Sequence, residues 1–418
     1  MEDCGPVKAI ILILDGAGVG RQDEPGNPCP AGANTLANTG RAATLHLPVM
    51  ESLGLGNIAG IPGVPPVSGP LASHGRCRLA YTGADSYLGH QEILGVTPPR
   101  AHRELLADSG HRIRTALEKA GRRARTAVPW GNALLVDDAI VICDNLEAEP
   151  GAAVNLLIPT AITAFEDGIA VGQIVRQEVG NLRVIVCGGE HFTTGEALHN
   201  MVLLGTGQVG VPTPSLALYD ETYQVRHLGL PVDTHRQLPY AFTRRELPVG
   251  LFGKVSDLVT DAVDARSPAA DTSEVMSLVL DHARSWADGL IVATVQETDL
   301  AGHQQDPQRM AQVLATVDSA LPALLAALGP DDVLAITADH GNDPTMRTSA
   351  HTREAVPLLW HQPHRPGINL GVRSSLSDPA ATIAALFSLP WSGEGEPLPM
   401  ICEHAPVDEQ PAGRSVRT

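Results

Sequence analysis

The chain has 418 residues, of which 43% are hydrophobic and 18% are charged, as expected of a globular protein. Its formal net charge of −18 argues against a nucleic-acid partner, which needs a basic surface, but does not exclude a local phosphate site. A chain of this length is expected to form two domains, or one core with a large insertion.

The cysteines and the apolar segments predict the compartment. Six cysteines are scattered without a C-x-x-C pair, which favours free thiols over a disulfide framework. The start of the chain has no signal-peptide pattern, and no apolar stretch is long enough to cross a bilayer. We therefore expect a cytoplasmic protein without a membrane partner; the sequence leaves its oligomeric state open.

The first predicted strand is an apolar run, residues 9–14, that ends at Asp15. An all-apolar strand is typical of a parallel sheet covered on both faces. The glycines that follow do not have the G-x-G-x-x-G spacing of a dinucleotide site, and no helix comes directly after them. Asp15 is either a ligand at the carboxyl end of the strand or the cap of a turn.

Ser86 lies where a small-residue turn leads into a predicted helix, in the stretch D-S-Y-L-G-H-Q-E at 85–92. Backbone N–H groups and the helix dipole stabilise an anion at such a position, which suits a nucleophile. The alternative is that Ser86 only caps the helix.

Residues 98–230 have the pattern of an inserted domain with its own helices and strands. An amphipathic run covers 102–125 and a helical pattern covers 165–178. Apolar strands are predicted at 133–143 and 182–187.

The rest of the chain alternates strands and helices, which predicts an α/β fold with a mostly parallel sheet. A strand and turn at 251–256 contain Lys254, and a helix at 272–286 has Thr272 or Ser273 as its N-cap. The strand at 289–295 leads to Asp299 and His303. Helices follow at 308–328 and 378–387, on either side of a strand at 333–338, and the tail at 403–418 is predicted to be disordered.

Three carboxylates and three imidazoles follow the predicted strands, and they are sufficient for two divalent metal ions with open positions. They are Asp15, Asp299, His303, Asp339, His340 and His351. Taken alone, the stretch D-H-G-N-D-P-T and the later His351 could also be a surface loop with two solvated histidines.

The chain resembles the alkaline phosphatase superfamily, and within it the phosphopentomutase family. The resemblance rests on L-D-G-A-G-V-G and G-A-N-T-L near the start, D-S-Y-L-G-H-Q-E at 85–92, D-L-A-G-H at 299–303, and D-H-G-N-D-P-T with A-H-T-R-E-A-V-P-L-L near the end. The spacing from Asp299 to His303 is closer to that of the related cofactor-independent phosphoglycerate mutases.

This resemblance implies a doubly wound, mostly parallel sheet in a catalytic core, residues 1–97 and 231–402, with a smaller α/β cap at 98–230. It also implies two divalent ions, typically manganese, with zinc or magnesium as alternatives. One would be held by Asp15, Asp339 and His340, and the other by Asp299, His303 and His351.

The implied function is that of an isomerase, a phosphomutase that forms a phospho-Ser86 intermediate on a small phosphorylated sugar. Ribose 1-phosphate and ribose 5-phosphate are the default pair. Arg353 and Lys254 are candidate phosphate contacts, whereas His90 and Glu92 are expected to hold the nucleophile in place.

The departures from the family pattern lie in the cap. The stretch at 154–159 has no acid where the family has a sugar-binding motif, and a basic residue expected near Cys187 is missing. Two alternatives therefore stay open: a metal-dependent hydrolase or transferase of another phosphate or phosphonate, and a non-catalytic relative that keeps the fold.

Overall fold

The computed structural model describes residues 7–24, 27, 29–99, 102–146, 150–216, 218, 222–230, 232–259, 263–346 and 350–399. The chain divides into two compact units, a core unit (Met1–Thr97 with Asp233–Thr418) and an inserted unit (Pro98–Val232). The tail predicted to be disordered, 403–418, lies outside the described residues. Among the helices that the structure describes, none is long and apolar enough to span a bilayer.

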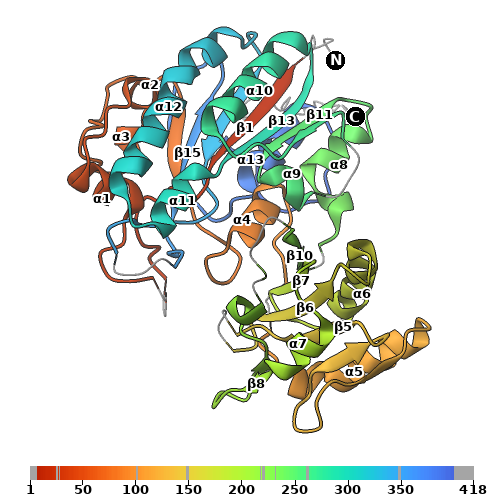
Figure 1. The fold of residues 1–418 in the computed structure, drawn as a ribbon. Coiled ribbons are helices and arrows are strands. Elements are labelled where there is room, and N and C mark those ends of the chain that lie inside the picture. Colours follow the sequence, from red (N-terminus) through yellow and green to blue (C-terminus); the bar gives the residue numbers. More distant parts are fainter. Residues whose placement is uncertain are drawn as a thin grey trace, which may run out of the picture. The chain divides into compact units, whose positions relative to one another are not determined.

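The core unit is built on an eight-stranded sheet with the strand order β12-β11-β13-β1-β14-β15-β2-β16 (Figure 1). β15 is antiparallel to both of its neighbours, and the other strand pairs are parallel. The predicted α/β class with a mostly parallel sheet is therefore confirmed. In this order the strands span Ala265–Ser267, Val249–Gly253, Gly289–Val295, Lys8–Leu14, Val333–Thr337, Val356–His361, Ser73–Cys77 and Asn369–Arg373.

The central strand β1 is buried at all seven positions, which explains its apolar sequence. It pairs in parallel with β13 on one side and β14 on the other. The carboxyl ends of these three strands therefore meet at one edge of the sheet. In open α/β sheets, ligands bind at this edge.

Helices α10 and α12 lie side by side against this sheet (Figure 1). The predicted N-cap of α10, Thr272 or Ser273, is wrong, because Asp271 has the extended backbone and its side chain accepts a hydrogen bond from the Glu274 N–H. The core helices are α1 (Thr35–Ala42), α2 (Pro48–Leu53), α3 (Leu55–Ile58), α4 (Ser86–Ile93), η2 (Thr234–Arg236), α8 (Leu238–Thr243), α9 (Val255–Leu258), α10 (Thr272–Ser285), α11 (Glu297–His303), α12 (Pro307–Ala326) and α13 (Asp378–Leu386).

The inserted unit has a six-stranded sheet in the order β10-β7-β6-β5-β4-β3, in which only the β6–β7 pair is parallel. Alternate side chains of β6 belong to two different apolar clusters, so both faces of this sheet are covered. The strands are β3 (Ala124–Thr126), β4 (Leu134–Val136), β5 (Ile140–Asp144), β6 (Ala153–Pro159), β7 (Arg183–Gly189) and β10 (Gln224–Gly229), with a separate pair β8 (Val202–Leu203) and β9 (Val209–Gly210).

The apolar stretch at 133–143 forms two strands, β4 and β5, joined by a turn at Asp137 and Asp138. Both aspartates have a positive φ, 50° and 60°, which is typical of a tight hairpin turn. The helices of this unit are α5 (Leu106–Lys119), α6 (Phe165–Glu178), α7 (Thr194–His199) and η1 (Thr213–Leu216).

Candidate active site

Ser86 is the first residue of α4 and is 3% exposed. The N-cap of this helix is Asp85, whose side chain accepts from the Leu88 N–H at 3.1 Å, so the interpretation of Ser86 as the cap is wrong. The Ser86 hydroxyl donates instead to Asp339 Oδ2 at 2.8 Å, and both Asp15 carboxylate oxygens lie 3.3 Å from it. The hydroxyl is therefore directed at two carboxylates of the sheet edge.

Asp15, Asp339 and His340 form a fully buried group at the ends of β1 and β14. His340 Nε2 lies 3.5 Å from Asp15 Oδ1 and 3.3 Å from Asp339 Oδ2. The Gly16 N–H donates to Asp339 Oδ1 at 3.0 Å and orients that carboxylate.

The two carboxylates of this group differ in electrostatic environment. Burial raises the pKa of Asp15 to about 7, and the Asp339 carboxylate contributes to the rise, while the Lys254 ammonium acts against it. Burial also acts to raise the pKa of Asp339, but the imidazoles of His340 and His90 lower it below its ordinary value. Since both carboxylates are buried beside each other, the group favours a compensating positive charge.

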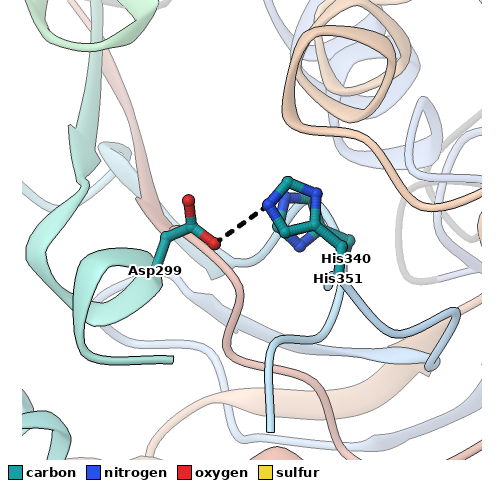
Figure 2. A group of neighbouring side chains, drawn as sticks. All are labelled: Asp299, His340 and His351. Carbon is teal, nitrogen blue, oxygen red and sulfur yellow. Dashed lines mark ion pairs between the residues drawn. The ribbon is translucent and has the colours of Figure 1, made fainter. Parts of the chain in front are cut away.

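Asp299 lies in α11, just after β13, and forms a second group with His340 and His351 (Figure 2). His351 Nε2 is 3.4 Å from Asp299 Oδ1, and the His351 ring stacks on His340 with 3.9 Å between centroids. The hydrogen bonds with His303 and His351 hold the pKa of Asp299 below its usual range, although burial acts to raise it. His340 therefore lies between the two groups.

His303 lies at the margin of the second group. Its Nε2 atom is 3.3 Å from Asp299 Oδ2 and 3.1 Å from His351 Nε2, and its side chain is 40% exposed. The structure thus brings all six predicted ligand residues together, with His303 the most exposed of those beside Asp299.

Lys254, after β11, reaches both groups. Its Nζ atom donates to Asp15 Oδ2 at 2.9 Å and lies 3.5 Å from Asp299 Oδ2. Burial acts to lower the pKa of Lys254, but the carboxylates of Asp15, Asp299 and Asp339 raise it above its ordinary value. Lys254 thus carries a positive charge beside Asp15, one of the two carboxylates that the Ser86 hydroxyl contacts.

Arg353 does not lie in this cluster. It is 8% exposed, and its guanidinium donates to the carbonyls of Leu79, Tyr81 and Gly83 and to Glu24. A guanidinium with these partners is committed to protein groups, so this arrangement does not favour the phosphate contact that the sequence suggested.

Three further buried residues contact the site, and the sequence did not predict a role for any of them. The Tyr81 hydroxyl donates to the Asp339 carbonyl at 3.0 Å and accepts from the Asp85 N–H at 3.2 Å. Thr294 Oγ1 lies 2.8 Å from His90 Nε2. Asn342 Nδ2 donates to Asp299 Oδ1 at 2.8 Å. A polar residue at the end of a buried strand is the only local signal that could have identified Thr294.

His90 and Glu92 contact the segment that carries Ser86. His90 Nδ1 lies 2.8 Å from the Ser86 carbonyl and 3.1 Å from Asp339 Oδ2. The Glu92 carboxylate accepts from the backbone N–H groups of Ala80 and Tyr81. We call residues 79–85 the nucleophile loop.

Comparison with known proteins defines first the class and then the family. A model described as the metalloenzyme superfamily matches residues 7–391, so the chain belongs to that superfamily. Phosphopentomutases of Symbiobacterium thermophilum and Desulfitobacterium hafniense are each 31% identical to it, over 93% and 90% of this chain and 97% and 95% of theirs. The phosphopentomutase of Anaeromyxobacter dehalogenans is 30% identical over 91% of this chain and 96% of its own. The chain therefore belongs to the phosphopentomutase family.

A solved phosphoglycerate mutase from Leishmania mexicana is a more distant match. It has a TM-score of 0.48 and 13% identity, with 95% of this chain and 98% of that chain covered. This likeness adds nothing to the family assignment.

The family implies divalent metal ions, and the residues present fit them. Each of the two groups offers three donor atoms within 4.8 Å of one another. Among the described residues, His340 Nε2 is a buried polar atom without a hydrogen-bond partner, as expected of a nitrogen reserved for a metal. Mixed carboxylate and imidazole donors suit divalent ions of the manganese-to-zinc series.

Proposed function

We propose that this enzyme is a phosphopentomutase that interconverts ribose 1-phosphate and ribose 5-phosphate. The observation that carries the proposal is the position of the Ser86 hydroxyl, 2.8 Å from Asp339 Oδ2 and 3.3 Å from both oxygens of Asp15. A buried hydroxyl at a helix start among ligand-type carboxylates is suited to accept a phosphoryl group.

Two manganese ions are the proposed cofactors. Asp15, Asp339 and His340 would hold one, and Asp299 with His351 and His303 would hold the other; His340 lies close enough to serve either. When bound, such ions stabilise the negative charge of the phosphoryl oxygens and favour the ionised serine.

The proposed isomerisation uses Ser86 twice. Its Oγ forms a bond to phosphorus as the bond between phosphorus and one sugar oxygen breaks, and the proton of the Ser86 hydroxyl goes to that sugar oxygen, which leaves phospho-Ser86 and the free sugar. The second sugar hydroxyl then attacks the same phosphorus, the bond between phosphorus and Ser86 Oγ breaks, and the proton of the attacking hydroxyl returns to Ser86 Oγ. Lys254, 2.9 Å from Asp15, supplies positive charge next to the transferred group.

The inserted unit is the proposed cap, residues 98–230. The stretch at 154–159 belongs to β6, which is buried at every position, and four of its six side chains belong to the two apolar clusters of the unit. The first exposed residues after β6 are Ala161 and Ile162. We propose that this end of β6, which carries no acid, makes the sugar selectivity of this enzyme differ from that of relatives with an acidic motif.

We also propose a cytoplasmic location. The four described cysteines, Cys29, Cys77, Cys143 and Cys187, are free thiols, as is usual in a reducing compartment.

The test is a screen of phosphosugars with manganese in which isomer and free phosphate are measured together. Conversion of ribose 1-phosphate into ribose 5-phosphate without free phosphate supports the proposal. Release of phosphate without isomer would support a hydrolase instead, although the family relationship favours a mutase. Fewer than one divalent ion bound per chain would favour a non-catalytic relative.

A further inference from the structure

The nucleophile loop is held by a buried cation on one side. Arg353 Nη1 donates to the carbonyls of Tyr81 at 2.6 Å and Gly83 at 2.7 Å, and Nη2 donates to that of Leu79 at 2.9 Å. Glu24 accepts from Arg353 Nε at 2.5 Å and fixes the orientation of the guanidinium plane. Three carbonyls at alternate positions of one short segment are therefore bound by a single side chain.

A buried anion holds the same loop through its N–H groups. The Glu92 carboxylate accepts from Ala80 N at 3.0 and 3.1 Å and from Tyr81 N at 2.9 Å. It also accepts from Ser375 Oγ and from the Leu376 N–H, which anchors it to the segment before α13. The backbone of the loop is thus fixed by charge-assisted hydrogen bonds through both its carbonyl and its N–H groups.

The nucleophile loop connects Arg353 and Glu92 to the Ser86 hydroxyl. The Tyr81 hydroxyl bridges the Asp339 carbonyl and the Asp85 N–H, and Asp85 caps the helix that begins with Ser86. Arg353 also follows His351 by two residues, and His351 Nδ1 lies 3.3 Å from the Ala84 carbonyl. The segment 351–353 thus contacts the nucleophile loop through the Arg353 guanidinium and supplies the predicted metal ligand His351.

We propose that Arg353 is a positioning residue that fixes Ser86 relative to Asp15 and Asp339; this inference rests on the proposed function. The guanidinium acts because its planar fork reaches several carbonyls at once, whereas an ammonium is a compact point charge. Loss of the fork leaves the metal-binding groups intact but lets the nucleophile loop move.

The test compares Arg353→Lys with Arg176→Lys. Arg176 is a matched control, because it is 7% exposed and its guanidinium also donates to backbone carbonyls, those of Leu228 and Val179, but in the inserted unit. Hydrogen exchange of the Tyr81 and Asp85 amides is measured in metal-loaded protein, together with kcat, KM and manganese affinity.

For Arg353→Lys we expect faster exchange at both amides and a kcat lower by about 10- to 100-fold, because a misplacement of about 1 Å costs this much. KM and manganese affinity stay close to those of the wild type. Arg176→Lys changes none of these quantities. If Arg353→Lys does not fold, Glu24→Ala, which removes the acceptor of the Arg353 Nε–H, is expected to give the same result.

Two results would overturn the positioning role. One is unchanged exchange of the loop amides in Arg353→Lys. The other is a higher KM with an unchanged kcat, which is the signature of a substrate contact. The exchange measurement needs no turnover, so it decides this inference even if the wild-type protein isomerises no phosphosugar and the proposed function fails.

Discussion

Replacing Asp339 by asparagine tests the first metal-binding group with little change in shape. Asp339 Oδ2 accepts a hydrogen bond from the Ser86 hydroxyl at 2.8 Å and lies 3.1 Å from His90 Nδ1 and 3.3 Å from His340 Nε2. The substitution removes one negative charge from the position where a divalent ion would bind. Two unit charges about 4 Å apart attract by about 4 kcal/mol at an effective dielectric constant of about 20, and the doubled attraction to a divalent ion is offset in part by the desolvation of the ion and the carboxylate. We therefore expect manganese affinity to fall by about 1,000-fold.

Calorimetric titration of metal-stripped protein with manganese measures this loss directly. Asp343→Asn is the matched control, because Asp343 is a buried carboxylate of the same loop whose oxygens accept from Asn34, Asn38 and Thr345 and belong to neither metal-binding group. The control is expected to lose stability and keep its manganese affinity. Equal affinities in Asp339→Asn and the wild type would refute the assignment of Asp339 as a ligand.

Three further predictions concern the nucleophile and the metals. Ser86→Ala is expected to lower the isomerisation rate by about 10⁶-fold, as expected on removal of a nucleophile. Its free energy of unfolding is expected to fall by less than about 3 kcal/mol, because one hydrogen bond to a charged group is lost. A variant that loses its activity only because it unfolds at the assay temperature would contradict this prediction. His351→Ala is expected to weaken manganese binding more than His303→Ala, because the His351 side chain is 15% exposed and the His303 side chain is 40% exposed. Titrations in which His303→Ala binds manganese more weakly than His351→Ala would contradict this prediction. Chelation lowers the free energy of unfolding by about 2.7 kcal/mol if the metal had been present at about 100 times its Kd, and an unchanged melting temperature would argue against a resident metal.

The sequence predicted the strand ends of the site well, because each one combines a local apolar run with a polar residue directly after it. Burial of β1 on both faces requires apolar side chains along the whole strand, so the polar residue that follows it, Asp15, marks the end of the strand. The helical pattern at 165–178 coincides with α6, since the periodicity of a helix is a local property of the sequence.

The sequence could not predict contacts whose geometry neighbouring residues do not determine. Asp85 and Ser86 are both good N-cap residues, and only the extended backbone of Asp85 decides between them. Arg353 binds carbonyls about 270 residues earlier in the chain, and no local pattern reveals such partners. The turn at Asp137 and Asp138 could have been found, since paired aspartates between apolar runs favour positive φ.

The central claim is that phosphate passes through Ser86, and peptide mapping by mass spectrometry tests it most directly. Protein loaded with manganese and quenched during turnover of ribose 1-phosphate is digested and searched for phosphorylated peptides. The account predicts phosphate on Ser86, with none on the same peptide from Ser86→Ala. An enzyme that forms ribose 5-phosphate while Ser86 stays unmodified would contradict it.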